Sequence, residues 1–354
     1  MERKLRIGVI GCGAISERRH LPEYAARKDV EIAALYNRTK RKAEELQKIY
    51  GGKVCGSIEE LVAMDLDAVS VCTPNARHAH DSILALRAGK HVLCEKPMDV
   101  SMNQCLAMTE EAKKAGKLLM IAQNQRFSGA HVKARELVSQ GAIGKVLSFD
   151  SRFGHAGPEH WTGIEDTWFF RRNVSGMGAL ADLGIHKADL IHYILGEPIV
   201  QVYASLATMD KKYPDGTPID VEDNAWCIYQ TLSGVCGSMH VSWTDYGQEY
   251  NSIVIRGTEG NIRCYDDRAH SLILETKDGR TIDLSTEKTL TNTDQTTLAG
   301  TDQHSGVIDE FVDCIQTGSA CRSTAEEVLK GMRVIFAALT SAQMGHMVSI
   351  PENR

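Results

Sequence analysis

Hydrophobic and polar positions follow two different rhythms along this chain. From residue 5 to about residue 122, short apolar runs alternate with longer amphipathic stretches, a pattern typical of βα units that build a parallel sheet. This part therefore predicts a doubly wound parallel sheet. Its expected strands are Leu5–Ile10, Glu31–Tyr36, Ala68–Cys72, His91–Cys94 and Leu118–Ile121, and its expected helices include Lys40–Tyr50, Ala79–Ala88 and Met102–Ala115.

After about residue 123, apolar strands follow one another with few helices between them. Neighbouring strands joined by short turns predict a large, open, mostly antiparallel sheet with helices on one face. We therefore expect an α/β chain with two domains, residues 1–122 and 123–354. The polar segment 285–303 is expected to be a loop. The second domain's expected helices are His131–Ser139, 179–195, Gly306–Gln316 and Thr324–Gln343, and its expected strands are Val146–Phe153, Ile199–Met209, Ala225–Leu232, Val235–Trp243, Ser252–Arg256 and Ile262–Tyr265.

Composition narrows the possible partners. The length of 354 residues fits two domains better than one. The net charge of -6 argues against nucleic acid as a partner, because nucleic-acid binding favours basic surfaces. No apolar run reaches about 18 residues, and the first residues lead directly into a strand without a signal-peptide region. We therefore expect no membrane partner and a cytoplasmic location.

The ten cysteines are scattered between Cys12 and Cys321 without a CxxC pair. Several of them, such as Cys72, Cys94 and Cys227, lie in apolar runs, where a free thiol behaves as a small hydrophobic side chain. The sequence therefore predicts reduced core thiols and no metal site.

A glycine-rich turn follows the first expected strand. Gly11 permits a tight turn, Gly13 lets the backbone approach a pyrophosphate, and the small Ser16 allows close packing of helix and strand. The phosphate would meet the unpaired N–H groups of the next helix. A plain glycine turn looks the same, but its place in a βα series favours a dinucleotide. The expected contacts in this turn are Gly11, Gly13, Ala14 and Ile15.

The end of the second expected strand bears on the choice of cofactor. Dinucleotide-binding folds place there an acid for the ribose 2′-hydroxyl or a basic group for a 2′-phosphate, and this chain has Asn37 and Arg38. Arg38 can bond a phosphate, which favours NADP. However, Asn37 can bond a hydroxyl, and a basic first helical turn can simply be solvated. The expected cofactor is NAD or NADP, with a slight preference for NADP.

Polar residues also follow the third expected strand, at the edge where parallel sheets bind ligands. Thr73, Pro74 and Asn75 end this strand, and His78 comes three residues later. We expect these four residues to contact the cofactor. A Pro-Asn turn with a helix-capping residue explains the same pattern structurally.

The fourth expected strand ends in Glu95-Lys96-Pro97. Pro97 restricts the backbone before it, through either a cis or a trans bond. A lysine beside a bound nicotinamide can lower the pKa of a substrate hydroxyl by hydrogen bonding and by its charge. The alternative is an ordinary surface lysine at a strand end. We expect Glu95 and Lys96 to contact the cofactor and Lys96 to be catalytic.

Asp182 and His186 lie four residues apart on the expected helix 179–195, so their side chains share one face. Imidazole titrates near neutral pH and suits acceptance of a hydroxyl proton. Asp182 would orient Lys96 or His186, and Asp189 would support them from nearly the same side. Such a pair alone is more typical of a surface helix cap, and the lysine motif makes the catalytic interpretation specific.

The stretch 154–178 mixes aromatic and basic side chains, which include His160 and Arg172. Aromatic faces and arginine groups suit a polyhydroxylated or glycosidic ligand, although a packed aromatic loop explains the composition equally well. Metal binding by these histidines is not expected. The expected substrate contacts are Arg126, His155, Trp161, Trp168, Arg171, Asp182 and His186.

These motifs together resemble the glucose–fructose oxidoreductase, inositol dehydrogenase and rhizopine-catabolism (Gfo/Idh/MocA) family. The resemblance covers essentially the whole chain, and the lysine-proline and Asp-x3-His elements are its specific part. It implies a Rossmann domain and an α/β domain whose open sheet forms homodimers or homotetramers. It also implies Lys96, Asp182 and His186 as the catalytic set. The departure is Asn37-Arg38 where many members carry an acid, which puts NAD preference in doubt.

We expect hydride transfer between a nicotinamide cofactor and a secondary ring hydroxyl of a sugar, glycoside or inositol. His186 would take the hydroxyl proton, and Lys96 would stabilise the developing alkoxide. The alternative is a redox-assisted glycoside-cleaving enzyme that oxidises a sugar C3 transiently with tightly bound NAD. A third interpretation is a non-catalytic dinucleotide sensor.

Overall fold

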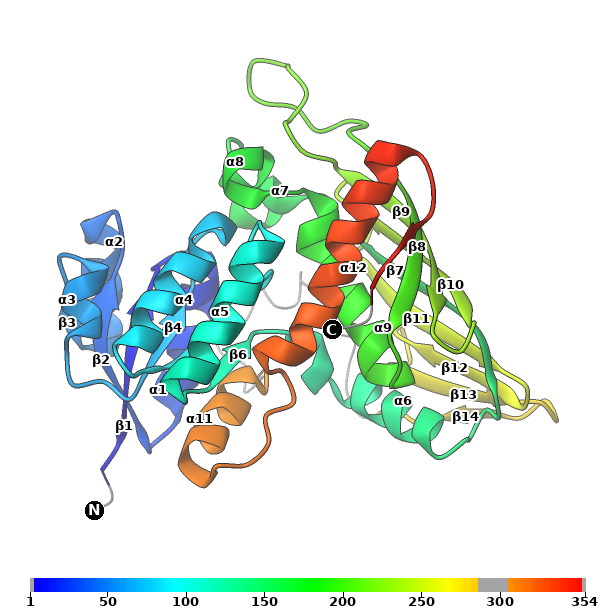
Figure 1. Cartoon of the computed structure of the whole chain (residues 1–354), viewed down its shortest axis with the longest axis horizontal. Helices are drawn as coiled ribbons and strands as arrows, with labels where there is room; N and C mark the ends of the chain where they lie inside the picture. Colours follow the sequence, from blue (N-terminus) through cyan, green and yellow to red (C-terminus); the bar gives the residue numbers. More distant parts are fainter. Residues whose placement is uncertain (1–2, 286–304, 352–354) are drawn as a thin grey trace. The chain divides into compact units, whose positions relative to one another are not determined.

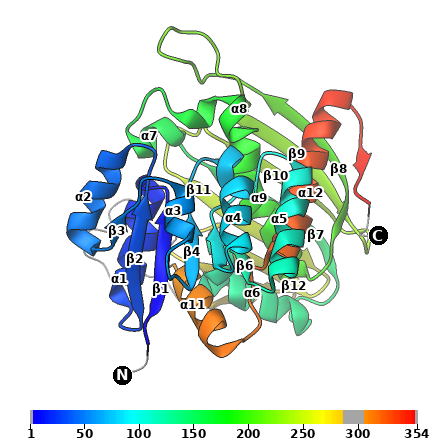
Figure 2. The ribbon, with the colours of Figure 1, turned by 60° about the vertical axis from the view of Figure 1, so that its left-hand side comes forward.

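The computed structural model describes residues 3–285 and 305–351, and they form two units. One unit contains residues 3–124 and 305–329, and the other contains residues 125–285 and 330–351. Figures 1 and 2 label their helices and strands from two directions. The expected domain limits at residues 122 and 123 remain a prediction. The sequence pattern did not indicate that a late segment of the chain belongs to the first unit.

The first unit contains the expected doubly wound parallel sheet, which confirms this part of the fold class. Its order is β3-β2-β1-β4-β5-β6, and every pairing is parallel. The order reverses direction between β1 and β4, the place where such sheets bind ligands at the carboxyl ends of their strands. The strands are β1 (Leu5–Ile10), β2 (Val30–Tyr36), β3 (Lys53–Val54), β4 (Ala68–Val71), β5 (His91–Cys94) and β6 (Leu119–Ile121).

Helices connect these strands, as the amphipathic stretches of the sequence predict. The expected helix Lys40–Tyr50 is confirmed without change, and so is Met102–Ala115. The helices of this part are η1 (Ser16–His20), α1 (Leu21–Ala26), α2 (Lys40–Tyr50), α3 (Ile58–Val62), η2 (Asn75–Arg77), α4 (His78–Arg87) and α5 (Met102–Ala115).

Helix α11 (Val307–Thr317) completes the first unit from the far end of the chain (Figure 1, orange). The Arg27 guanidinium donates to Asp309 at 2.9 Å. Beyond the helix, the Ile121 amide of β6 donates to the Ser323 carbonyl at 2.9 Å. These contacts join residues 309–323 to two parts of the first unit, namely the connection before β2 and the strand β6.

The second unit contains a nine-stranded sheet in the order β14-β13-β12-β11-β7-β10-β9-β8-β15. The β7–β10 pairing is parallel, and the other pairings are antiparallel, which confirms the expected mostly antiparallel sheet. The strands are β7 (Val146–Gly154), β8 (Ile199–Ala207), β9 (Asn224–Thr231), β10 (Cys236–Ser242), β11 (Tyr250–Gly257), β12 (Gly260–Cys264), β13 (Leu272–Thr276), β14 (Thr281–Asp283) and β15 (Val348–Ser349).

One helical segment of the second unit is almost entirely buried. The expected helix 179–195 is divided into a π-helix, η5 (Leu180–Gly184), and α9 (Ile185–Leu195). η5 packs on β10, and α6 (Gly129–Ser139) packs on α9, so both sides of this segment are covered. The remaining helices, of which η3 and α12 begin with residues of the first unit, are η3 (Asn124–Phe127), α7 (Pro158–Thr162), η4 (Trp168–Phe170), α8 (Arg172–Ser175) and α12 (Ala325–Met344).

Four short strands were not expected from the sequence, namely β3, β13, β14 and β15. They lie at or next to the edges of their sheets, where fewer neighbours constrain the residue pattern. The expected loop 285–303 lies, apart from residue 285, outside the described residues. No helix in the described ranges combines the length and the apolar character that a membrane span needs.

Candidate functional site

The turn after β1 requires glycine at one position and leaves open space at another. Gly11 has φ +98°, and a Cβ atom there would lie 2.5 Å from the Cys72 carbonyl oxygen. A side chain therefore cannot replace its hydrogen without moving the backbone. A Cβ atom at Gly13 would meet no atom within 4 Å, so a phosphate could approach this backbone. The Ser16 hydroxyl donates to the Gly13 carbonyl at 2.9 Å and fixes the turn on the following helix.

Asn37 connects the ends of β1 and β2. Its Oδ1 accepts the Cys12 amide at 3.0 Å, and its Nδ2 donates to the Thr39 carbonyl at 2.9 Å. Arg38 beside it is exposed. The side-chain amide of Asn37 thus forms hydrogen bonds within the protein, whereas Arg38 is exposed to solvent.

His78 connects the turns that follow β4 and β5. Its Nε2 lies 2.7 Å from the Thr73 carbonyl, and its Nδ1 lies 2.7 Å from the Pro97 carbonyl. The Thr73 hydroxyl donates to the buried Asp81 at 3.0 Å. These bonds show that His78 positions both turns. Whether it also contacts a cofactor remains a prediction, as it does for Pro74 and Asn75.

The Lys96-Pro97 peptide bond is cis, one of the two forms that the sequence allows. The Lys96 amide donates to Glu95 Oε2 at 3.1 Å, and Glu95 Oε1 lies 3.0 Å from His20 Nε2. Burial by itself raises the pKa of Glu95, but the bond from His20 and the nearby charges bring it below its ordinary value. Glu95 is therefore an anion that fixes the backbone of Lys96.

His20 is a supporting residue that the sequence analysis did not identify. Its Nδ1 lies 3.1 Å from the Ser70 hydroxyl, which is also bonded to Tyr24 at 2.8 Å. The ring is buried and spans from β4 to Glu95. Its only sequence signal is a histidine in the first helix, and the contact to Glu95 joins residues 75 positions apart.

In the second unit, Asp182 is held by a tryptophan. The Trp243 indole N–H donates to Asp182 Oδ2 at 3.1 Å, and His155 Nε2 lies 4.0 Å from the same oxygen. Asp182, His155 and His186 are each at most 7% exposed. The Phe153 ring lies near both imidazoles, with centroids 6.0 Å from His155 and 6.1 Å from His186. The structure thus places two histidines of the expected site beside one aromatic ring, with Asp182 close to one of them.

Glu222 fixes the start of the helical segment that carries Asp182 and His186. Its Oε1 accepts the amides of Gly178 at 2.7 Å and Leu180 at 3.1 Å. A Cβ atom at Gly178 would lie 1.9 Å from the Glu222 carbonyl oxygen, so only glycine fits there. The sequence analysis missed Glu222, although an acid three residues before the expected strand Ala225–Leu232 was the available signal.

Arg126 and Asp189 form a buried ion pair. The Arg126 Nε and Nη2 atoms lie 2.7 and 2.6 Å from the two oxygens of Asp189, a paired geometry typical of strong charged hydrogen bonds. Both residues are at most 2% exposed. Asp189 was expected to support the site, and the structure places it against Arg126. A substrate contact by Arg126 remains a prediction.

The expected substrate aromatics form a continuous series of rings. Trp168 stacks on Phe169 with centroids 3.9 Å apart, and Trp161 meets Phe169 edge-on at 5.7 Å. Phe169 in turn lies 6.4 Å from Trp243, the residue that bonds Asp182. Arg171 is paired with Asp166 at 2.6 Å. The aromatic series therefore reaches Trp243, the indole that bonds Asp182, and substrate contacts by these residues remain a prediction.

Lys96 belongs to the first unit, and Asp182 and His186 belong to the second. The structure shows the local support of each group, and the catalytic set as a whole remains a prediction.

Comparison with known proteins identifies the class to which this chain belongs. Residues 5–123 match a family described as "Oxidoreductase family, NAD-binding Rossmann fold". Residues 131–263 match the "GFO/IDH/MocA C-terminal domain". The first unit is thus an NAD-binding Rossmann domain of the oxidoreductase type. The chain belongs to the Gfo/Idh/MocA family, as the sequence motifs indicated.

Individual relatives carry related names. A D-glucoside 3-dehydrogenase of Escherichia coli is 34% identical over 56% of this chain and 56% of its own length. The match thus spans only about half of that relative. A myo-inositol 2-dehydrogenase of Thermotoga maritima is 31% identical over 78% of this chain and 79% of its own. A solved aldose-aldose oxidoreductase of Caulobacter crescentus, complexed with glycerol, has a TM-score of 0.81, 26% identity and coverage of 98% of this chain and 100% of that one.

Proposed function

We propose that this protein is a dehydrogenase that transfers a hydride between a nicotinamide cofactor and a secondary ring hydroxyl of a sugar, glycoside or cyclitol. The names of its relatives support this class of substrate and do not favour the glycoside-cleaving alternative. The observation that carries the proposal is the buried Asp182, held by Trp243 at the end of a series of aromatic rings. Stacked rings beside a buried proton-handling group suit a ring alcohol.

Each catalytic residue has a distinct role in this proposal. Lys96 holds the substrate oxygen and stabilises alkoxide charge, while His186 accepts the hydroxyl proton. Asp182 fixes the protonation of the pair, and Trp243 holds Asp182 in place. A bound nicotinamide cofactor would accept the hydride. Gly11, Gly13 and the helix that follows them would hold the pyrophosphate of this cofactor.

We further propose that NADP is accepted at least as well as NAD. Both the oxygen and the nitrogen of the Asn37 side chain are bonded to the backbone, which leaves this side chain poorly placed to bind a ribose hydroxyl. Arg38 is exposed and can donate to a 2′-phosphate. A homodimer or homotetramer through the nine-stranded sheet and a cytoplasmic location also belong to this proposal.

The proposal is tested by following the absorbance of reduced nicotinamide with a panel of sugars, glycosides and inositols. Each would be added with NAD, with NADP and without cofactor. We expect sustained reduction with an added cofactor, and Lys96→Ala should lower kcat by about 100-fold or more while cofactor affinity stays nearly unchanged. The control is Lys113→Ala, which removes an exposed lysine of α5.

Two results would contradict the proposal. Full activity of Lys96→Ala would exclude the assigned role of that lysine. A single stoichiometric change of bound nucleotide, without sustained turnover, would favour the glycoside-cleaving alternative instead.

A further inference from the structure

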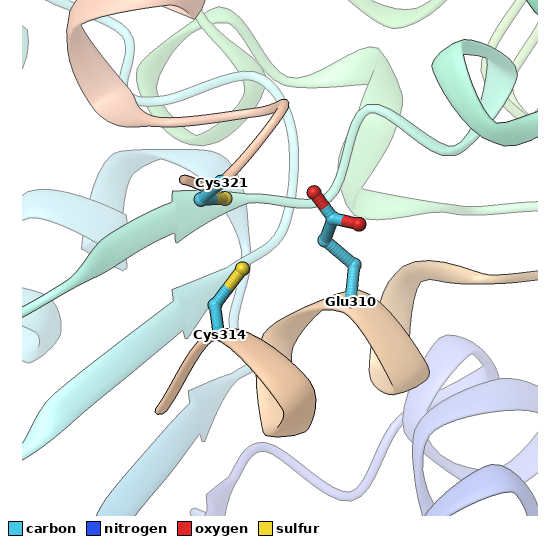
Figure 3. Close-up of side chains that lie close together, drawn as sticks. All are labelled: Glu310, Cys314 and Cys321. Carbon is cyan, nitrogen blue, oxygen red and sulfur yellow. The ribbon is translucent and has the colours of Figure 1, made fainter. Parts of the chain in front are cut away.

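Three potential metal ligands meet in the first unit, in a segment far along the chain from the glycine-rich turn and from Lys96. Glu310 and Cys314 lie one helical turn apart on α11, and Cys321 is in the loop that follows. Their ligand atoms all lie within 4.8 Å of one another. Figure 3 shows the Cys314 sulfur directed from the helix towards Cys321, and the Glu310 carboxylate rising from the same side. Among the described residues, no other group of three such ligands is this close.

Arg322 orients the carboxylate and balances its charge. Its Nε and Nη2 atoms donate to Glu310 Oε2 at 3.0 and 2.8 Å, and its amide donates to Oε1 at 2.8 Å. Within the described ranges, Oε1 accepts the bond from this amide alone, so it keeps a lone pair for a further partner. Two thiolates, one carboxylate and one guanidinium carry a net charge of about minus two, which a divalent cation neutralises.

The sulfur atoms lie in a partly desolvated position with support from a neighbour. Cys314 is 7% exposed, and the Glu310 side chain is 13% exposed. The Ser319 hydroxyl donates to the Cys314 sulfur at 3.7 Å, a contact of the kind that stabilises metal-bound thiolates. Metal binding to these cysteines would release protons, because thiols ligate metals as thiolates.

We propose that Glu310, Cys314 and Cys321 bind one thiophilic divalent metal ion of the zinc class. Two thiolates and a carboxylate are ligands that zinc accepts in a tetrahedral site, and the fourth position would hold water. The scattered cysteines of the sequence predicted no metal site because they lack CxxC spacing. The fold instead pairs two cysteines seven positions apart and adds a carboxylate from one turn earlier on the helix.

The ion would connect α11 to the sheet of the first unit. Ser323, two residues after Cys321, donates to the Ile121 carbonyl of β6 at 2.7 Å. A metal that links Cys314 on the helix to Cys321 in the loop would therefore fix the segment between these two cysteines, which ends next to β6. Binding to the folded state alone would stabilise this unit by mass action.

The test uses the full chain, freed of metal with a chelator and kept reduced. Cobalt(II) is added as a spectroscopic probe, because tetrahedral cobalt with thiolate ligands absorbs in the visible range. We expect one cobalt per chain, displacement by zinc, and a higher thermal midpoint in zinc than in chelator. Cys314→Ser and Cys321→Ser should each abolish the thiolate absorption, and Glu310→Gln should weaken cobalt binding about tenfold or more.

Cys236→Ser is the matched control, because Cys236 is an exposed free thiol on β10 of the other unit. It should leave the cobalt spectrum and the zinc effect unchanged. Wild-type titrations remain decisive even if a cysteine variant fails to fold. Absence of thiolate–cobalt absorption in the reduced wild-type protein would overturn the proposal, and so would its persistence in the Cys314→Ser, Cys321→Ser double variant. Formation of a Cys314–Cys321 disulfide together with no cobalt binding by the reduced protein would show a redox pair instead.

Discussion

Lys187 is a fully buried lysine directly after the expected base His186. Its ammonium group is bonded to the side-chain oxygen of Asn251 and lies 5.6 Å from the Phe153 ring centroid. Burial lowers the pKa of Lys187 from 10.5 to about 7, although Cys264 and Glu249 act in the opposite direction. The amide oxygen and the aromatic ring offer less compensation than a carboxylate would, so the charged form is disfavoured.

This lysine predicts a pH dependence of stability. Between about pH 7 and pH 10.5 the unfolded chain holds a proton that the folded chain has released. The free energy of unfolding should therefore rise with pH across this window, and below pH 7 the folded state carries the full cost of a buried cation. Lys187→Met should raise the urea midpoint at pH 6 and flatten its increase towards pH 9.

The exposed Lys277 offers the matched control for this measurement, and Lys277→Met should leave the pH profile unchanged. An equally steep rise with pH in Lys187→Met would show that other groups cause it.

Single residues also show where sequence reasoning succeeded and where it could not. Gly11 was predictable because its turn is a local property of neighbouring residues. Trp243 was not, because its bond to Asp182 joins residues 61 positions apart and exists only once the sheet is formed. His20 and Glu95 are a similar case. Local motifs were thus enough to propose the site residues, whereas the residues that hold them in place depend on tertiary structure.

Among the elements, the π-helix η5 is held at its start by a side chain that lies about 40 positions further along the chain. Two amides at this end donate to the buried carboxyl of Glu222 rather than to a local capping side chain. Burial raises the pKa of Glu222 to about 7, although the hydrogen bonds that it accepts act against this shift. Between about pH 4.5 and pH 7 the Glu222 carboxyl therefore takes up a proton when the chain folds. Its contribution to the free energy of unfolding is complete below about pH 4.5 and is lost as the pH rises through 7.

Substitutions of Glu222 should separate its hydrogen bonds from its charge. Glu222→Gln keeps an oxygen acceptor for Gly178 and Leu180 and removes the titration, so it should unfold with a smaller change in stability between pH 5 and pH 8. Glu222→Ala leaves two buried amides without an acceptor, which should cost about 1–3 kcal/mol for each. It should also lower kcat by displacing Asp182.

Urea unfolding at both pH values and steady-state kinetics would measure these effects. An alanine variant with wild-type stability and kcat would contradict the assigned positioning role, as would a glutamine variant that is as impaired as the alanine variant.

The sequence predicted most elements of both sheets because apolar runs and helical periodicity extend over many residues. It missed β3, β13, β14 and β15, which are short or lie near sheet edges. It also could not distinguish a π-helix from an α-helix over 179–195, since both present a similar apolar pattern.

At the scale of the whole molecule, one face of the nine-stranded sheet carries large exposed side chains. Tyr203 of β8 and Ile228 of β9 face each other across the strand pair and are 40% and 53% exposed. Trp226 stacks on His240 with ring centroids 4.8 Å apart. Contiguous exposed aromatic and aliphatic groups on a sheet are typical of protein interfaces, and we expect a second copy of this chain to cover them.

Ile228→Glu should therefore lower the molar mass measured by light scattering, because it would bury an unpaired carboxylate in the interface. Ile49→Glu on α2 replaces an isoleucine that is still more exposed, at 70%, and lies outside the sheet, so it should have no effect. A wild-type monomer, or an Ile228→Glu variant that assembles normally, would exclude this face as the interface.

The return of α11 to the first unit has a consequence for biosynthesis. The parallel sheet is translated before α11, so Arg27 and Ile121 must wait for Asp309 and Ser323, which follow them by 282 and 202 positions. While the ribosome adds the intervening residues, the edge of β6 has no partner from that segment. A nascent chain that stalls after the antiparallel sheet would thus expose an incomplete Rossmann unit, the kind of surface that chaperones bind.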